Sequence, residues 1–174
     1  RLPNNNSAKH ALVSYFQMYL SGTTATPEQR LKMICTFIES NNEYYRTLGL
    51  DALRTALSYH QFVGSGACGI PFGMRSRDYG YMPKGDEVKA WYETFTDYAC
   101  EQIIGGTWTS PEVKSILAEN IRGICHCGLI SIIENASERI LKTTDWFEGW
   151  LACGEMLHHD ADKMDEAYHT RIEL

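Results

Sequence analysis

Apolar residues recur at intervals of three and four along most of the chain, which is the period of amphipathic helices. The first such stretch covers about residues 7–20, and later ones begin near residues 26, 43, 86, 110, 128, 145 and 162. No sustained alternation of apolar and polar residues occurs outside residues 61–86, so a sheet is not expected. The pattern therefore predicts an all-α chain of about eight helices.

Capping signals support the predicted helix starts. Thr26–Gln29 reads as a capping box, with Pro27 in the first turn, where its missing N–H costs nothing. Ser110–Glu112 predicts the same cap-then-proline start for the fifth helix, and Asp145–Glu148 predicts a further capping box. Because the connections are short, we expect consecutive helices to be antiparallel neighbours.

The later helix starts are evenly spaced. They fall near residues 110, 128, 145 and 162, every 17 or 18 residues, which gives about 35 residues per helix pair. This is the range of TPR and HEAT-like repeats, but the TPR consensus positions do not occur. We therefore expect a single α-helical domain over 1–174, built as an irregular HEAT- or armadillo-like solenoid or as an ordinary helical bundle.

Composition narrows the class of protein. Of the 174 residues, 44% are apolar, enough for a core, and the net charge of −6 argues against a dedicated nucleic-acid binder. The sequence contains no run of about 18 apolar residues, so we expect no membrane span. The chain begins at Arg1 and ends inside a helical pattern, which predicts a fragment of a longer protein.

The six cysteines include no CxxC pair, and five of them fall in apolar helical stretches. In a chain of this length, such cysteines are expected to be buried, reduced thiols rather than disulfides. This favours a reducing, cytoplasmic location.

The segment 61–86 is the one long interruption of the helical pattern. It contains six of the fourteen glycines, four aromatic residues and three basic residues. Long connections of this kind tend to be functional, and an arginine fork grips phosphate or carboxylate in bidentate fashion. The segment therefore predicts an anion- or partner-binding patch, to which Trp108 adds an exposed anchor or a plug between helices. The candidate residues are Arg75, Arg77, Asp78, Tyr79, Tyr81 and Trp108.

A structural role for the same segment stays open. In that interpretation, Arg75 or Arg77 pairs with Asp78 or with a helix carboxylate, and the tyrosines fill gaps between helices. The usual glycine-rich frames of nucleotide phosphate sites do not occur in the sequence.

A metal site is the enzymatic alternative. The candidate metal residues are His158, His159 and Asp160. His159-Asp160 alone resembles the His-Asp motif of all-α HD phosphohydrolases, with His126 as a guessed upstream ligand, and the 14 residues after Asp160 leave little room for the downstream Asp of that family. Adjacent helical residues point about 100° apart, however, so the two histidines are badly placed to share one ion. At the C-terminal end of a helix, the same histidines can instead act as cations that stabilise the last backbone carbonyls. The resulting hypothesis is a metal-dependent hydrolase.

Two further interpretations concern reactive and aromatic side chains. Cys68 and His60 form a possible nucleophile pair, but no residue that would orient the histidine can be nominated. The aromatic residues of the predicted helices lie at core spacing rather than on a stacking surface for nucleic acid. Those expected in the core are Trp91, Phe95, Trp146, Phe147 and Trp150.

The segments Arg46–Arg54, Phe72–Tyr81, Trp91–Tyr92 and Trp146–Leu151 resemble a helical-repeat region of large bacterial proteins. Those proteins are often multidomain, with a nucleotide-hydrolysing or other effector domain elsewhere in the chain, and some look defence-related. The likeness covers roughly residues 44–160. It implies a regulatory or sensing segment without catalysis of its own.

The sequence thus predicts a non-catalytic helical scaffold or sensing module without a cofactor. Its expected partner is a protein, a neighbouring domain or an anionic ligand. The metal-dependent hydrolase and nucleic-acid binding through the basic residues of 61–86 remain the alternatives.

Overall fold

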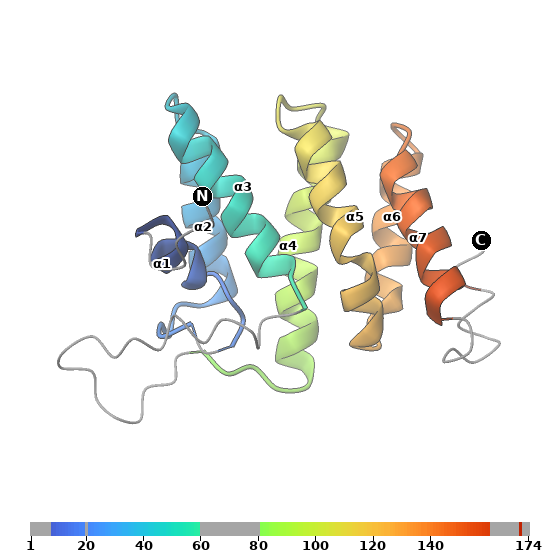
Figure 1. Cartoon of the computed structure of the whole chain (residues 1–174), viewed down its shortest axis with the longest axis horizontal. Coiled ribbons are helices and arrows are strands. Elements are labelled where there is room, and N and C mark those ends of the chain that lie inside the picture. The colour runs from blue at the N-terminus through green and yellow to red at the C-terminus, as the bar shows by residue number, and fades with distance from the viewer. Residues whose placement is uncertain (1–7, 20, 60–80, 161–170, 172–174) are drawn as a thin grey trace, which may run out of the picture. The chain divides into compact units, whose positions relative to one another are not determined.

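A computed structural model of the chain describes residues 8–19, 21–59, 81–160 and 171 (Figure 1). These residues form α-helices and no strand, which confirms the predicted all-α class. The eighth helix, expected near residue 162, lies outside the described residues. The seven helices are α1 (Ala8–Ser14), α2 (Pro27–Ile38), α3 (Glu43–Leu57), α4 (Asp86–Ile104), α5 (Ser110–His126), α6 (Ile130–Leu141) and α7 (Phe147–Asp160).

The chain divides into two compact units, residues 1–95 and residues 96–174, with the boundary inside α4. Each unit has its own buried apolar residues. Within the described part of the chain, no helix is both long enough and apolar enough to cross a membrane.

In the first unit, α2 packs closely against α3 (Figure 1). The approach is closest at Gly49, where an added Cβ would lie 2.7 Å from Cγ1 of Ile38 and 3.0 Å from its backbone nitrogen. Ile34 and Leu53 are fully buried in the same unit. The glycine therefore sets the distance between the two helices.

The structure confirms one predicted cap and corrects another. At α2, the Gln29 backbone N–H donates to the Thr26 hydroxyl, and the Gln29 side chain accepts from the Thr26 backbone N–H. At α5, the N-cap is Thr109 rather than Ser110, and its side chain makes no capping bond; its hydroxyl instead hydrogen-bonds with the Thr107 hydroxyl. The predicted cap-then-proline start therefore holds for α2, whereas at α5 the proline lies in the first turn as predicted and the predicted cap at Ser110 is wrong.

Arg30 is a heavily bonded, buried side chain of the first unit. It is only 3% exposed, and its guanidinium donates to the chain between α1 and α2. Nε donates to the Ala25 carbonyl at 3.0 Å. Nη1 donates to the carbonyls of Tyr15 and Gln17, and Nη2 to the Ser21 hydroxyl and the Thr23 carbonyl. All five N–H donors of this guanidinium thus have an acceptor.

Two aromatic rings complete the surroundings of Arg30. Its guanidinium carbon lies 4.9 Å from the ring centre of Trp91 and 5.7 Å from that of Tyr81, which is within cation–π range. Burial lowers the pKa of Arg30 to about 10, so the side chain is still charged at neutral pH. Trp91 in turn donates its indole N–H to the Ala56 carbonyl at 2.8 Å. This Arg30 cluster joins α2, α3 and α4.

In the second unit, α5 is the central helix, and α7 packs mainly on it. Trp146, just before α7, is buried and donates its indole N–H to the Lys114 carbonyl at 3.1 Å. Its ring lies over Gly149, where an added Cβ would come within 2.4 Å of the indole. Met156 and Asp160 are buried on the same inner face of α7.

The prediction of a core position is right for three aromatic residues and wrong for two. Trp91, Phe95 and Trp146 are buried, whereas Phe147 is 66% and Trp150 71% exposed. The reason is that apolar residues occur on two faces of α7. The buried face carries Gly149, Met156 and Asp160, and Phe147 and Trp150 lie off that face.

We predict that Arg30→Met, which keeps most of the side-chain volume, lowers the free energy of unfolding by roughly 3 kcal/mol, since several buried oxygens lose their donor. Lys32→Ala, on the exposed side of the same helix, should change it by less than about 0.5 kcal/mol. Urea unfolding followed by circular dichroism measures both. A loss below about 1 kcal/mol for Arg30→Met would show that water replaces the guanidinium.

We also predict opposite effects of alanine at two helical glycines. Gly49→Ala should destabilise the chain by about 1–3 kcal/mol, because Ile38 and Phe37 of α2 leave no room for a methyl group. Gly154→Ala should stabilise it by up to about 1 kcal/mol, since nothing lies within 4 Å of an added Cβ there. Melting temperatures of the two variants test this, and equal shifts would contradict it.

Candidate functional site

Most of the predicted binding patch in 61–86 falls where the structure gives no description. Arg75, Arg77, Asp78 and Tyr79 lie outside the described residues, so their proposed role stays a prediction. Tyr81 is described and half-buried, and its ring stacks on Trp91 at 5.7 Å. Tyr81 therefore belongs to the Arg30 cluster, where it helps to fix the start of the segment that leads into α4.

Trp108 lies in the connection between α4 and α5 and is 56% exposed. Of the two roles that the sequence leaves open, this exposure favours an anchor for a partner over a plug between helices.

The candidate metal residues lie at the end of α7. Asp160 is 1% exposed, and its carboxylate accepts two hydrogen bonds from Arg122, at 2.6 and 2.8 Å. His126 Nε2 lies 3.3 Å from the same carboxylate. His158 and His159 are exposed, and their rings contact each other edge to face at 4.9 Å.

This arrangement gives Asp160 a partner other than a metal. The hydrogen bond that Arg122 donates to Asp160 raises the pKa of Arg122, so the guanidinium keeps its charge beside the carboxylate. Arginine does not coordinate metal ions, and its positive charge repels a metal cation. Among the described residues, no three His, Cys, Asp or Glu side chains come together in a way that would hold an ion.

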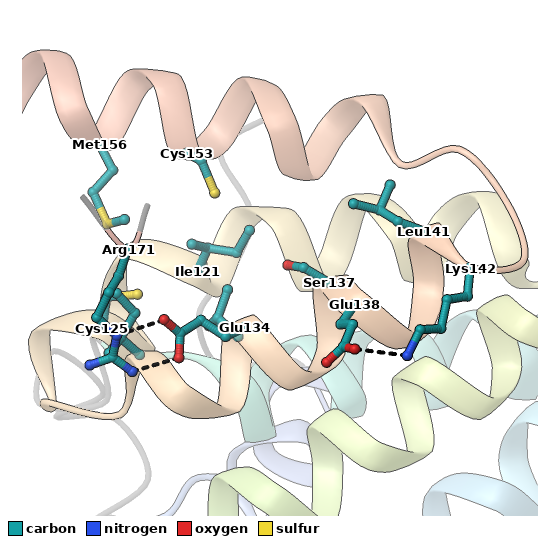
Figure 2. Close-up of a pocket in the computed structure, with 12 residues that line it drawn as sticks. Ile121, Cys125, Glu134, Ser137, Glu138, Leu141, Lys142, Cys153, Met156 and Arg171 are labelled. Carbon is teal, nitrogen blue, oxygen red and sulfur yellow. Dashed lines mark hydrogen bonds and ion pairs between the residues drawn. The ribbon is translucent and has the colours of Figure 1, made fainter. Parts of the chain in front are cut away.

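The second unit contains a groove of about 500 Å³ between α6 and α7 (Figure 2). Both helices pack on α5, but they make little direct contact with each other, and the groove occupies the space that this leaves. Figure 2 shows Cys153 and Met156 extending from α7 towards Ile121 of α5. The further apolar lining comes from Cys125, Ile130, Ile133 and Leu141.

Charged residues border this groove in opposite pairs. Glu134 accepts two hydrogen bonds from Arg171, and Glu138 accepts one from Lys142 at 2.8 Å (Figure 2). Lys142 lowers the pKa of Glu138, which keeps this carboxylate ionised. Because each carboxylate has a basic partner, the border is polar but carries little net charge. Its chemistry suits an apolar occupant rather than a phosphate.

The described cysteines are free thiols, as the sequence predicts, while Cys68 lies outside the described residues together with His60. Burial raises the pKa of the Cys100 thiol to about 11 and also raises that of Cys153. A thiol with a raised pKa is a poor nucleophile at neutral pH. Cys153 therefore contributes to the groove as an apolar, polarisable side chain.

The outer face of α7 is a second apolar surface. Phe147, Trp150 and Leu151 are 66%, 71% and 46% exposed, and the rings of Phe147 and Trp150 lie 5.7 Å apart. These residues follow helical spacing, as do those of the inner face. We call Phe147, Trp150, Leu151, Gly154 and His158 the outer stripe of α7.

Sequence reasoning missed both the groove and the outer stripe. The signal for the stripe is present, since residues 146–157 are apolar on two sides of one helix. The groove has no comparable signal, because it depends on how far α6 stands from α7.

Comparison with protein-family models, with curated proteins and with solved structures finds no match to this chain. The candidate site is therefore defined by its own geometry. The likeness to helical-repeat regions stays a prediction.

We predict that Cys100 of the folded protein reacts with iodoacetamide at pH 8 roughly 100-fold more slowly than in the unfolded chain, because burial raises its pKa from 9.0 to about 11. Cys127, which is half-buried, serves as the internal comparison and should react faster. Site-resolved mass spectrometry measures both rates. Equal rates for Cys100 in the folded and unfolded chain would contradict the burial described above.

Proposed function

We propose that this chain is a non-catalytic helical binding module, and that the groove between α6 and α7 receives an apolar segment of a protein partner. The observation that carries this proposal is the chemistry of the groove, which combines an apolar lining from three helices with a border of paired charges. Binding sites of this size are usually apolar, with a few polar groups that orient the ligand.

The surroundings of the groove support a binding role over catalysis. The polar residues at its border are two ion pairs and Ser137, and the thiol of Cys153 has a raised pKa. An enzyme site would need an activated nucleophile or a base that is free to take a proton. The groove instead offers contact area, together with donors and acceptors along its edges.

A protein segment fits this groove better than an anion does. Arg171 and Lys142 are engaged by Glu134 and Glu138, so an incoming phosphate would have to displace a carboxylate. An apolar side chain instead gains about 25 cal/mol for each Å² that it buries. If the partner is a neighbouring domain, the apolar segment that enters the groove belongs to the same parent chain.

We predict that peptides selected from a random display library on the wild-type chain bind through an apolar anchor in this groove. Ser137→Trp fills the groove from α6 and should weaken each selected peptide at least about tenfold, or roughly 1.4 kcal/mol. The matched control is Ser131→Trp, which adds the same side chain at an exposed position of α6. Fluorescence anisotropy measures the dissociation constants.

The proposal fails if no peptide is enriched, or if the selected peptides bind wild type and Ser137→Trp equally well. It is supported if affinity drops in Ser137→Trp and stays unchanged in Ser131→Trp. Circular dichroism spectra of both variants show whether they keep the helical fold.

A further inference from the structure

We propose that Glu134 is the specificity-determining residue of the groove, and that it selects a partner segment with an arginine next to its apolar anchor. In the chain on its own, Arg171 occupies this position as an intramolecular substitute for that arginine. The inference rests on the proposed function, because it names the chemistry of the segment that enters the groove.

The first argument is the geometry at the carboxylate. Glu134 and Arg171 both line the groove, and Nε and Nη2 of Arg171 donate to separate oxygens of Glu134 at 2.6 and 2.5 Å (Figure 2). This bidentate arrangement matches the planar fork of a guanidinium, and an ammonium group cannot reproduce it. The border of the groove thus already holds an arginine side chain, which identifies the chemical group that Glu134 accepts.

The second argument is that this ion pair is open to exchange. The side chains of Glu134 and Arg171 are 37% and 42% exposed, and ion pairs with such exposure contribute little to stability. The bidentate pair of Asp160 with Arg122 differs, because the Asp160 side chain is 1% exposed and is closed to solvent. An arginine of the partner segment can therefore replace Arg171 on Glu134 at little cost.

The third argument is the charge that this exchange leaves at the border. Lys142 lies one turn from Glu138 on α6, so that pair is local to one helix. Arg171 instead comes from outside α6, 37 residues along the chain from Glu134. When Arg171 leaves, the border keeps one uncompensated carboxylate, and the whole chain has a net charge of −6. Both charges attract a basic segment.

Binding of the segment also strengthens the new ion pair. An apolar anchor in the groove excludes water beside Glu134, and an ion pair is stronger where the local dielectric constant is lower. The arginine of the partner segment therefore gains more from Glu134 than the exposed Arg171 does, so the exchange favours the complex.

Peptides selected from a random display library on the wild-type chain, and kept only if Ser137→Trp weakens them, test the selectivity. We expect an arginine beside the apolar anchor of these peptides. Replacing it by citrulline, which keeps the shape and removes the charge, should weaken binding at least about threefold. In Glu134→Gln, the two peptides should bind within about twofold of each other, whereas the matched control Glu138→Gln should keep the preference. Fluorescence anisotropy measures the dissociation constants.

Arg171→Gln tests the intramolecular substitute. This variant should bind the arginine peptide roughly two- to fivefold more tightly than the wild type does, and it should bind the citrulline peptide equally well. Lys142→Gln is the matched control, because it removes the same charge from the same border. Its gain in affinity should be smaller, since Lys142 does not contact Glu134 through any of the ion pairs described above.

The inference is overturned if the groove-binding peptides carry no arginine, if citrulline or Glu134→Gln makes no difference, or if Lys142→Gln acts as strongly as Arg171→Gln. In each of these cases the peptides still bind in the groove, so the proposed function stands. If no selected peptide binds in the groove, both proposals fail. Circular dichroism spectra show whether the variants keep the helical fold.

Discussion

The need to satisfy one buried cation organises the first unit. Arg30 carries five N–H donors into a site that is almost closed to water, and it is met by four backbone carbonyls and one hydroxyl. Leaving such donors unpaired would cost several kcal/mol. The connection between α1 and α2 therefore has to turn around the guanidinium. Local turns, such as the one closed by the bond from the Ala25 N–H to the Thr23 hydroxyl, also shape this connection, and Arg30 ties them together.

Both units also use a buried tryptophan to tie one helix to another. Trp91 donates to the Ala56 carbonyl near the end of α3, and Trp146 donates to the Lys114 carbonyl of α5. In each case, the indole contributes apolar contact and one hydrogen bond that fixes its orientation. The buried face of α7 carries Gly149, Met156 and Asp160, and Trp150 lies off that face and is exposed.

The sequence predicts the helices well because each apolar stripe and the capping box at Thr26 are local signals. It does not predict the burial of Arg30, since the acceptors come from five positions of a connection that has no regular pattern. The exposure of Phe147 and Trp150 is missed for a related reason. Two apolar faces on one helix give no local clue to which of them meets the core. The groove depends on the distance between α6 and α7, which no single residue encodes.

The most direct test of the central role of Arg30 is nuclear magnetic resonance of its guanidinium group. A rigid, fully bonded guanidinium beneath two aromatic rings should give separate Nη–H signals that exchange slowly with water and are displaced by ring currents from Trp91. Averaged signals that exchange as fast as those of a surface arginine would contradict this account of the scaffold.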